Sequence, residues 1–190
     1  MNLDIDKIES NWQTYEKLLK RLCDDNLNNL LDDLADRLCS CPASMRIDQY
    51  ACTPGGLIQH SLDVTATMRN LNDSLELGLS VSSILKTGLL HDIGKVGDIE
   101  NDYFLSQESE WHREKLGQMY RYNENIQKMS LSHRSLFLLQ HYGVVLAEDE
   151  WIAIQLAQGS HFEENRFYAR SEPTLGLILQ QAKSLSIHRS

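Results

Sequence analysis

The segment SILKTGLLHDIGKVGD, residues 83–98, ends an apolar run on a histidine and an aspartate, His91 and Asp92. Both side chains are costly to bury without a partner, and a metal ion is the partner that uses an imidazole and a carboxylate together. His60 offers a second imidazole about thirty residues earlier. These nitrogen and oxygen donors predict a site for a divalent metal ion, and zinc, manganese, iron, cobalt and nickel all suit the residue types.

Two neighbouring helices must bring these donors together. We expect one helix to begin near Gly56 and to run to about residue 71, which places His60 about one turn from its start. A second helix is expected from Ser80 to Leu90, so that His91 and Asp92 follow its end. Adjacent helical residues diverge by about 100°, so this pair converges best where the helix is ending, as the following Gly94 indicates.

Composition favours an all-α fold. The chain has 190 residues, 42% hydrophobic and 24% charged, with only three prolines and ten glycines to interrupt helices. This length suits one ordinary domain with a substantial core. We predict one structural unit over residues 51–190, with N-terminal helices in residues 1–50 packing on it.

Charge and cysteine usage limit the class of partner. The formal net charge of −9 argues against a nucleic acid or an anionic membrane as the main partner, because both require a positive field. No apolar run is long enough to span a membrane, and the four cysteines match neither a disulfide framework nor a zinc motif. We therefore expect a cytoplasmic protein with reduced thiols.

The remaining sequence predicts further helices around one long irregular segment. Two amphipathic helices are expected between residues 5 and 38, and later helices over 134–143, 147–159 and 172–186. Residues 99–133 are polar, aromatic and poorly periodic, with a short helix expected at 111–120. A loop of this length is often a lid or a pocket wall. We predict that residues 99–117 cover the candidate site.

Two motifs resemble a known family. TPGGLIQHSLDV (residues 53–64), followed by TGLLHDIGKVGD (residues 87–98), resembles the opening of the HD-domain superfamily of metal-dependent phosphohydrolases. RSLFLLQHYGVVLAEDEWIAI (residues 134–154) is similar to the helix, acidic turn and helix that follow in small members. The resemblance covers roughly residues 50–185. It implies an all-α HD-domain helical bundle with the site between central helices.

The resemblance also implies a ligand set, from which this chain departs. His60, His91 and Asp92 match the metal ligands, but Lys183 stands where a final Asp is expected. Ala157 stands where related sequences often carry a His. An ammonium in place of a carboxylate opposes metal binding, and Lys183 could instead pair with Asp92. Otherwise the register differs, or another acid completes the set: Asp98, Glu163 or Glu164.

Cations and aromatic residues near the site are the candidates for substrate contact. The resemblance implies that Lys95 lies near a substrate phosphate, although it could equally be a solvated surface lysine. Arg113, with a guanidinium suited to phosphate, and Trp111, with a face suited to a base, lie with His112 in the expected lid. His133 is either an additional metal ligand or a residue at a helix start.

Two functions remain open from the sequence. The first is a metal-dependent phosphohydrolase acting on a nucleotide or another small phosphorylated compound, with Asp92, Lys95 and Arg113 as catalytic groups. The metal ion would lower the pKa of a bound water, and the cations would stabilise developing charge. The second is a binding or scaffold module that keeps the HD fold but has weakened catalysis, as Lys183 and Ala157 indicate. Substrate identity and oligomeric state stay open.

Overall fold

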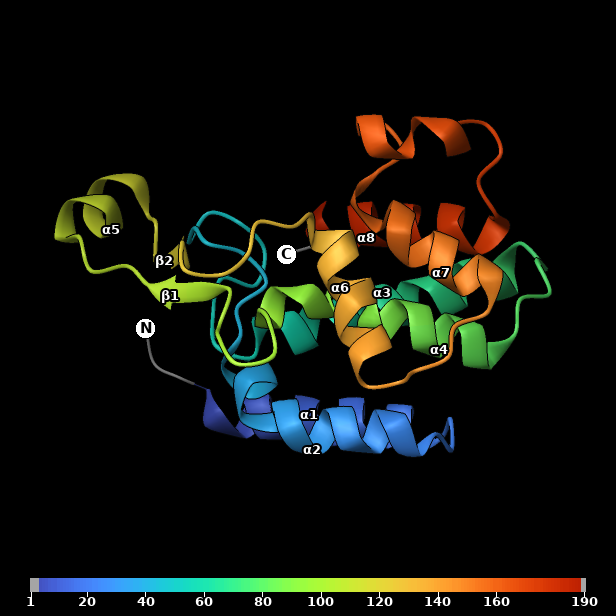
Figure 1. Cartoon of the computed structure of the whole chain (residues 1–190), viewed down its shortest axis with the longest axis horizontal. Coiled ribbons are helices and arrows are strands. Elements are labelled where there is room, and N and C mark those ends of the chain that lie inside the picture. The colour runs from blue at the N-terminus through green and yellow to red at the C-terminus, as the bar shows by residue number, and fades with distance from the viewer. Residues whose placement is uncertain (1–3, 189–190) are drawn as a thin grey trace.

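The computed structural model describes residues 4–188 as a bundle of helices in layers, with one small sheet. In Figure 1, α1 (Ile5–Lys20) and α2 (Asp25–Ser40) form the lower layer, and α3 (Gly56–Ser74) and α4 (Val81–Leu90) form the middle. α7 (Glu148–Gln155) and α8 (Thr174–His188) lie above, while α6 (Leu131–His141) crosses in front. The all-α prediction is confirmed.

Short polar residues begin several of these helices where the sequence predicts. The Ser80 side chain accepts a hydrogen bond from the Ser83 amide at the start of α4, and Ser130 accepts one from the His133 amide at the start of α6. Such caps satisfy amides that have no partner within the helix. α6 therefore begins three residues before the predicted start at residue 134.

Two apolar clusters hold the layers together. The larger one joins the leucines of α1 and α2 to Leu57, Ile58 and the buried residues of α4 and α6. The second lies between α3, α7 and α8 and contains Ala157, which is 3% exposed. Residues 4–50 and 51–188 thus share the larger core. No helix in residues 4–188 combines the length and hydropathy needed to cross a membrane.

Close approach of the central helices depends on two glycines. A Cβ on Gly88 of α4 would lie 2.5 Å from the Thr65 side-chain oxygen of α3. A Cβ on Gly94 would lie 2.8 Å from backbone atoms of α6. Because real side chains do not approach so closely, only glycine lets α3 and α6 pack directly against the end of α4 and the 3₁₀ helix η1 (Ile93–Val96).

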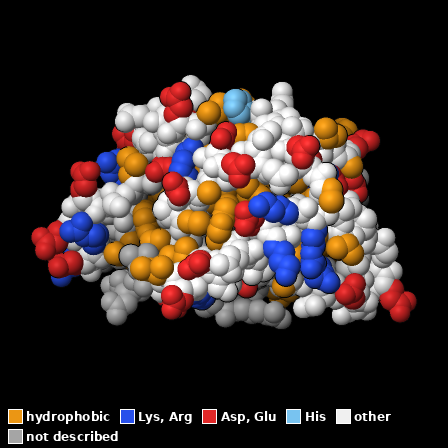
Figure 2. Space-filling model, turned by 90° about the horizontal axis from the view of Figure 1, so that it is seen from below, with side chains coloured by type: hydrophobic (Ala, Val, Ile, Leu, Met, Phe, Trp, Pro, Cys, Tyr) orange, Lys and Arg blue, Asp and Glu red, His pale blue; other side chains and the backbone are white. Residues whose placement is uncertain are grey.

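The segment after η1 forms an arm at one end of the bundle. β1 (Phe104–Ser106) pairs antiparallel with β2 (Tyr120–Tyr122), and α5 (Glu110–Leu116) connects them. Figure 1 shows α5 projecting from the bundle, and α5 has no buried residue. The remaining elements are the 3₁₀ helices η2 (Leu156–Gln158) and η3 (Glu163–Tyr168). Figure 2 shows acidic and basic side chains interspersed around a hydrophobic hollow on the lower face.

Arg37 of α2 fixes the loop between η1 and β1. Its guanidinium donates to the carboxylate of Asp102 at 2.7 Å and to four carbonyl oxygens of residues 96–101. We expect Arg37→Met to lower the free energy of unfolding by about 1–3 kcal/mol, because these acceptors lose a charged donor. Urea denaturation measures the loss. Arg46→Met, which removes an exposed pair with Asp48, should cost less than about 1 kcal/mol. Equal losses would contradict the anchoring role.

Candidate functional site

His60, His91 and Asp92 converge between α3 and the end of α4, as the sequence predicts. Their ligand atoms all lie within 4.8 Å of one another, and the two imidazole rings are 5.8 Å apart. All three residues are buried, with exposed fractions of 3%, 0% and 0%. His60 lies one turn into α3, while His91 and Asp92 follow α4, where the chain tightens into η1.

The backbone around His91 sets its orientation. The Nδ1 atom of His91 lies 2.9 Å from the carbonyl oxygen of Gly88, so Nδ1 carries the proton and Nε2 presents a lone pair to the cluster. The hydroxyl of Ser135 donates to the His91 carbonyl and accepts from the Gly94 amide. α6 therefore holds the turn that carries His91 and Asp92.

Three donors surround the carboxylate of Asp92. Oδ1 accepts from the Lys183 ammonium at 2.9 Å and from the Gln158 amide at 2.7 Å. Oδ2 lies 2.8 Å from the Lys95 ammonium. The two lysines are only 5% and 8% exposed. The expectation that Lys183 pairs with Asp92 is thus confirmed by the structure.

Lys95 is held firmly in place by the residues around it. Its ammonium also donates to the Ala43 carbonyl at 2.8 Å and to the Tyr50 hydroxyl at 3.0 Å. The Tyr50 ring also lies against the His60 ring, with 4.6 Å between centroids. The alternative that Lys95 is a solvated surface lysine is therefore wrong.

The charges of the cluster shift its pKa values. Burial alone would raise the pKa of Asp92, but the charges of Lys183 and Lys95 hold it well below its ordinary range. Burial lowers the pKa of His60 to about 2, and neighbouring His91 and Lys95 contribute. Burial likewise lowers the pKa of His91 to about 4, although Asp92 opposes this shift. Both rings are neutral at pH 7.

The pKa values of the two lysines shift in opposite directions. Burial disfavours the charge of Lys95, but Asp92 and Tyr50 outweigh it and raise the pKa of Lys95. Burial lowers the pKa of Lys183, and the charge of Lys95 adds to this effect, while Asp92 opposes it. Asp92 paired with two ammonium groups leaves an excess of one positive charge in the cluster.

The positions of the donor atoms favour a metal ion at this site, whereas the surrounding positive charge disfavours one. His60 Nε2 and His91 Nε2 are buried without a hydrogen-bond partner beside the Asp92 carboxylate, so by position the three residues could hold one. A divalent ion about 4 Å from an ammonium is repelled by about 8 kcal/mol at an effective dielectric constant of about 20. Each lysine therefore offsets part of the attraction of Asp92, which is already paired with both ammonium groups. The complete set of residues does not fit a resident divalent cation.

Two cavities reach the cluster from different sides. The larger, about 1100 Å³, is lined by Lys95 and Gln158, which both contact Asp92. Its aromatic wall consists of Tyr50, Tyr103, Phe104, Tyr122 and Phe162. A second cavity of about 580 Å³ lies between α1 and the start of α3 and is lined by His60 and Tyr50. Tyr50 thus borders both cavities.

The structure corrects the expected lid. The first part of the predicted segment, including Tyr103 and Phe104, does line the larger cavity, but α5 lines neither cavity. Trp111 is 58% exposed. Arg113 donates to the carbonyls of Gln107 and Glu108, and His112 contacts the Ser109 hydroxyl. α5 projects outward, so the structure places these three residues away from both cavities, and their roles in substrate contact stay predictions.

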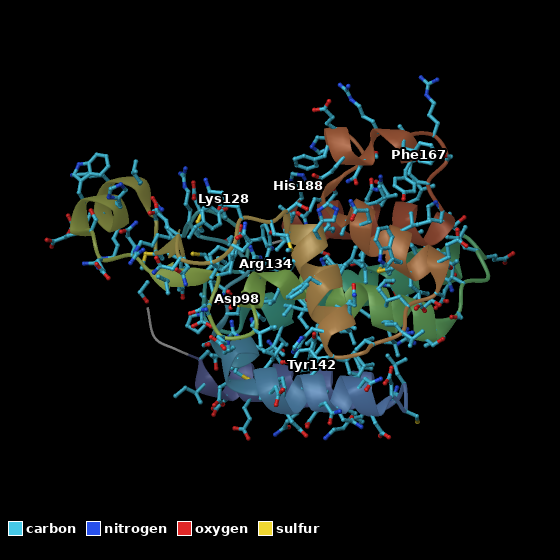
Figure 3. All side chains as sticks on the ribbon, in the orientation of Figure 1. Asp98, Lys128, Arg134, Tyr142, Phe167 and His188 are labelled. Atoms are coloured by element: carbon cyan, nitrogen blue, oxygen red, sulfur yellow. The ribbon has the colours of Figure 1, made fainter. Side chains whose placement is uncertain are left out.

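Other predicted residues are distributed around the molecule. Asp98 accepts hydrogen bonds from the amides of Glu100 and Asn101 in a turn beside α2, so it does not complete the metal set (Figure 3). His133 is exposed in the first turn of α6 and supplies no additional ligand. Glu164 lines the larger cavity. Sequence reasoning missed Tyr50 and Gln158, whose only signals are their positions just before TPGG and Gly159.

The protein is a helical bundle with a buried His-His-Asp cluster between its central helices. A scan against protein-family models matches the HD domain over residues 57–187, which is more than half of the chain. The chain therefore belongs to the HD-domain family, as the sequence motifs predict. A search of curated proteins and a search of solved structures each returned no match.

Proposed function

We propose that this protein is an HD-domain binding module for a small phosphorylated compound, with a nucleotide as the favoured ligand. The observation that carries the proposal is the cavity that ends on Lys95 and Gln158, behind which Asp92 is paired with two lysines. The excess positive charge of this cluster favours an anion over a cation at the end of the cavity.

The walls of the larger cavity support the choice of ligand class. Its volume of about 1100 Å³ can contain a nucleotide-sized compound. Aromatic side chains from β1, β2 and the 43–50 loop supply faces on which a base can stack. The phosphate end would lie toward Lys95, whose position is fixed by three oxygen atoms.

A phosphohydrolase that uses a metal ion at His60, His91 and Asp92 is the second candidate function. Family membership and the two unpartnered imidazole nitrogens favour it. In that case the two histidines and the aspartate would hold the ion, which would supply an activated water. Phosphate release from nucleotides in the presence of Mn²⁺ would favour the hydrolase. Ligand binding without phosphate release would favour the binding module.

The aromatic wall gives a direct test of the larger cavity. Phe162 lines the cavity, whereas Phe167, in the same irregular segment, is 88% exposed and points outward (Figure 3). We expect Phe162→Ala to weaken nucleotide binding by about tenfold, because one stacking contact is lost. Phe167→Ala is the matched control and should leave affinity unchanged. Calorimetric titration with adenosine and guanosine phosphates measures both. Equal affinities for Phe162→Ala and the wild type would contradict this location.

A further inference from the structure

We propose that the Lys183 ammonium is a built-in replacement for the metal ion of this centre, so that the folded protein is complete without a divalent cation. The proposal concerns the charge of the cluster and does not depend on which ligand enters the larger cavity. A weakened site would still bind a metal ion with low affinity, whereas here the lysine has the structural role that the cation would have.

The Asp92 carboxylate already has three partners, with which a cation would have to compete. Lys183 and Gln158 both donate to Oδ1, and Lys95 lies 2.8 Å from Oδ2. These donors come from three separate elements: α8, η2 and η1. A metal ion would have to share with these donors a carboxylate that has no exposure to water.

The packing of α8 positions the Lys183 ammonium. Leu175, Ile178, Leu179 and Ala182 bury one face of α8 against α3 and α7. Lys183 directly follows Ala182, so the packing of this face fixes where its side chain enters the bundle. The Lys183 side chain therefore enters the bundle toward Asp92 and does not project into solvent.

The Lys183 ammonium also places positive charge near the histidines. His91 Nε2 lies 3.7 Å from Asp92 Oδ2, and both are electron-rich at neutral pH. Such a pair needs a positive group nearby, which a metal ion would otherwise provide. The charge of Lys183 acts on both His60 and His91 as well as on Asp92. Lys183 thus joins Lys95 in supplying positive charge to all three potential ligands.

Metal titration of Lys183 variants tests the proposal. Protein is dialysed against Co²⁺ or Mn²⁺, metal content is measured by elemental analysis, and Co²⁺ coordination is followed by visible absorption. We expect the wild type to retain far less than one equivalent. Lys183→Asp removes the ammonium and adds an oxygen ligand, so it should bind one equivalent at least a hundredfold more tightly.

Two further variants keep the test decisive. Lys183→Met removes the charge without adding a ligand, and it should show a smaller gain in metal affinity even if Lys183→Asp fails to fold. Lys86→Met is the matched control, because Lys86 forms a similar partly buried ion pair with Glu150 away from the cluster. It should leave metal binding unchanged. A wild type that binds one equivalent tightly, or a folded Lys183→Met variant with no gain, would overturn the proposal. Nucleotide titration of the wild type separately tests the proposed function.

Discussion

Asp92→Asn should lower the free energy of unfolding by about 3–5 kcal/mol, because it leaves two buried ammonium groups without their counter-ion. A loss of this size is a large part of the stability of an ordinary domain. Urea denaturation monitored by circular dichroism measures it. The substitution keeps the shape of the side chain, so the change isolates the charge of Asp92 from its packing.

A double variant and a surface control separate pairing from a general effect of substitution. Asp92→Asn combined with Lys183→Met should cost less than the two single changes added together, because one unpaired charge is removed. Asp48→Asn breaks an exposed ion pair with Arg46 and should cost less than about 1 kcal/mol. If Asp92→Asn unfolds at the same urea concentration as the wild type, the two ion pairs contribute nothing.

Acidification should destabilise the protein well above the pH at which carboxylates titrate. In the unfolded chain a histidine has a pKa of about 6.5, whereas in the folded protein burial lowers the pKa of His91 to about 4 and of His60 to about 2. The unfolded state therefore binds protons first. Stability is complete above about pH 6.5 and falls as the pH decreases toward the folded pKa values.

The expected size of this effect is about 2 kcal/mol for each ring between pH 7 and pH 5, or about 4 kcal/mol together. Denaturation curves at several pH values measure the slope. His60→Gln should remove about half of the pH dependence. His141→Gln replaces an exposed histidine and should preserve it. A free energy of unfolding that stays constant between pH 7 and pH 5 would show that the two rings are not buried in the neutral form.

The centre of the fold could be predicted because local sequence determines it. A helix that starts at the glycine pair places His60 one turn in, and an apolar helix that ends at Leu90 places His91 and Asp92 directly after it. The pairing of Lys183 with Asp92 was one of the alternatives that the family resemblance left open. His60 and Lys183 lie on helices and His91 and Asp92 directly follow one, so helical pattern and the family resemblance together predicted this part of the site.

Residues on irregular segments could not be placed in the same way. Tyr50 lies in the connector before α3, and Gln158 lies where α7 has tightened into η2, so neither has a helical period to predict its direction. α5 was expected over the site because it lies in a long irregular segment, and such segments often form lids. Its position instead depends on the pairing of β1 with β2. Each strand has only three residues, which is too short to show an alternating pattern in the sequence.

Arg37 has a consequence for exchanging parts between related proteins. It belongs to α2, which precedes the 57–187 segment matched by the family, yet it fixes the loop that follows the candidate site. The leucines of α1 and α2 also complete the larger core. A chimera that transplants only residues 57–187 would therefore leave behind both an anchor and half of an apolar interface. The smallest interchangeable unit of this protein includes its first two helices.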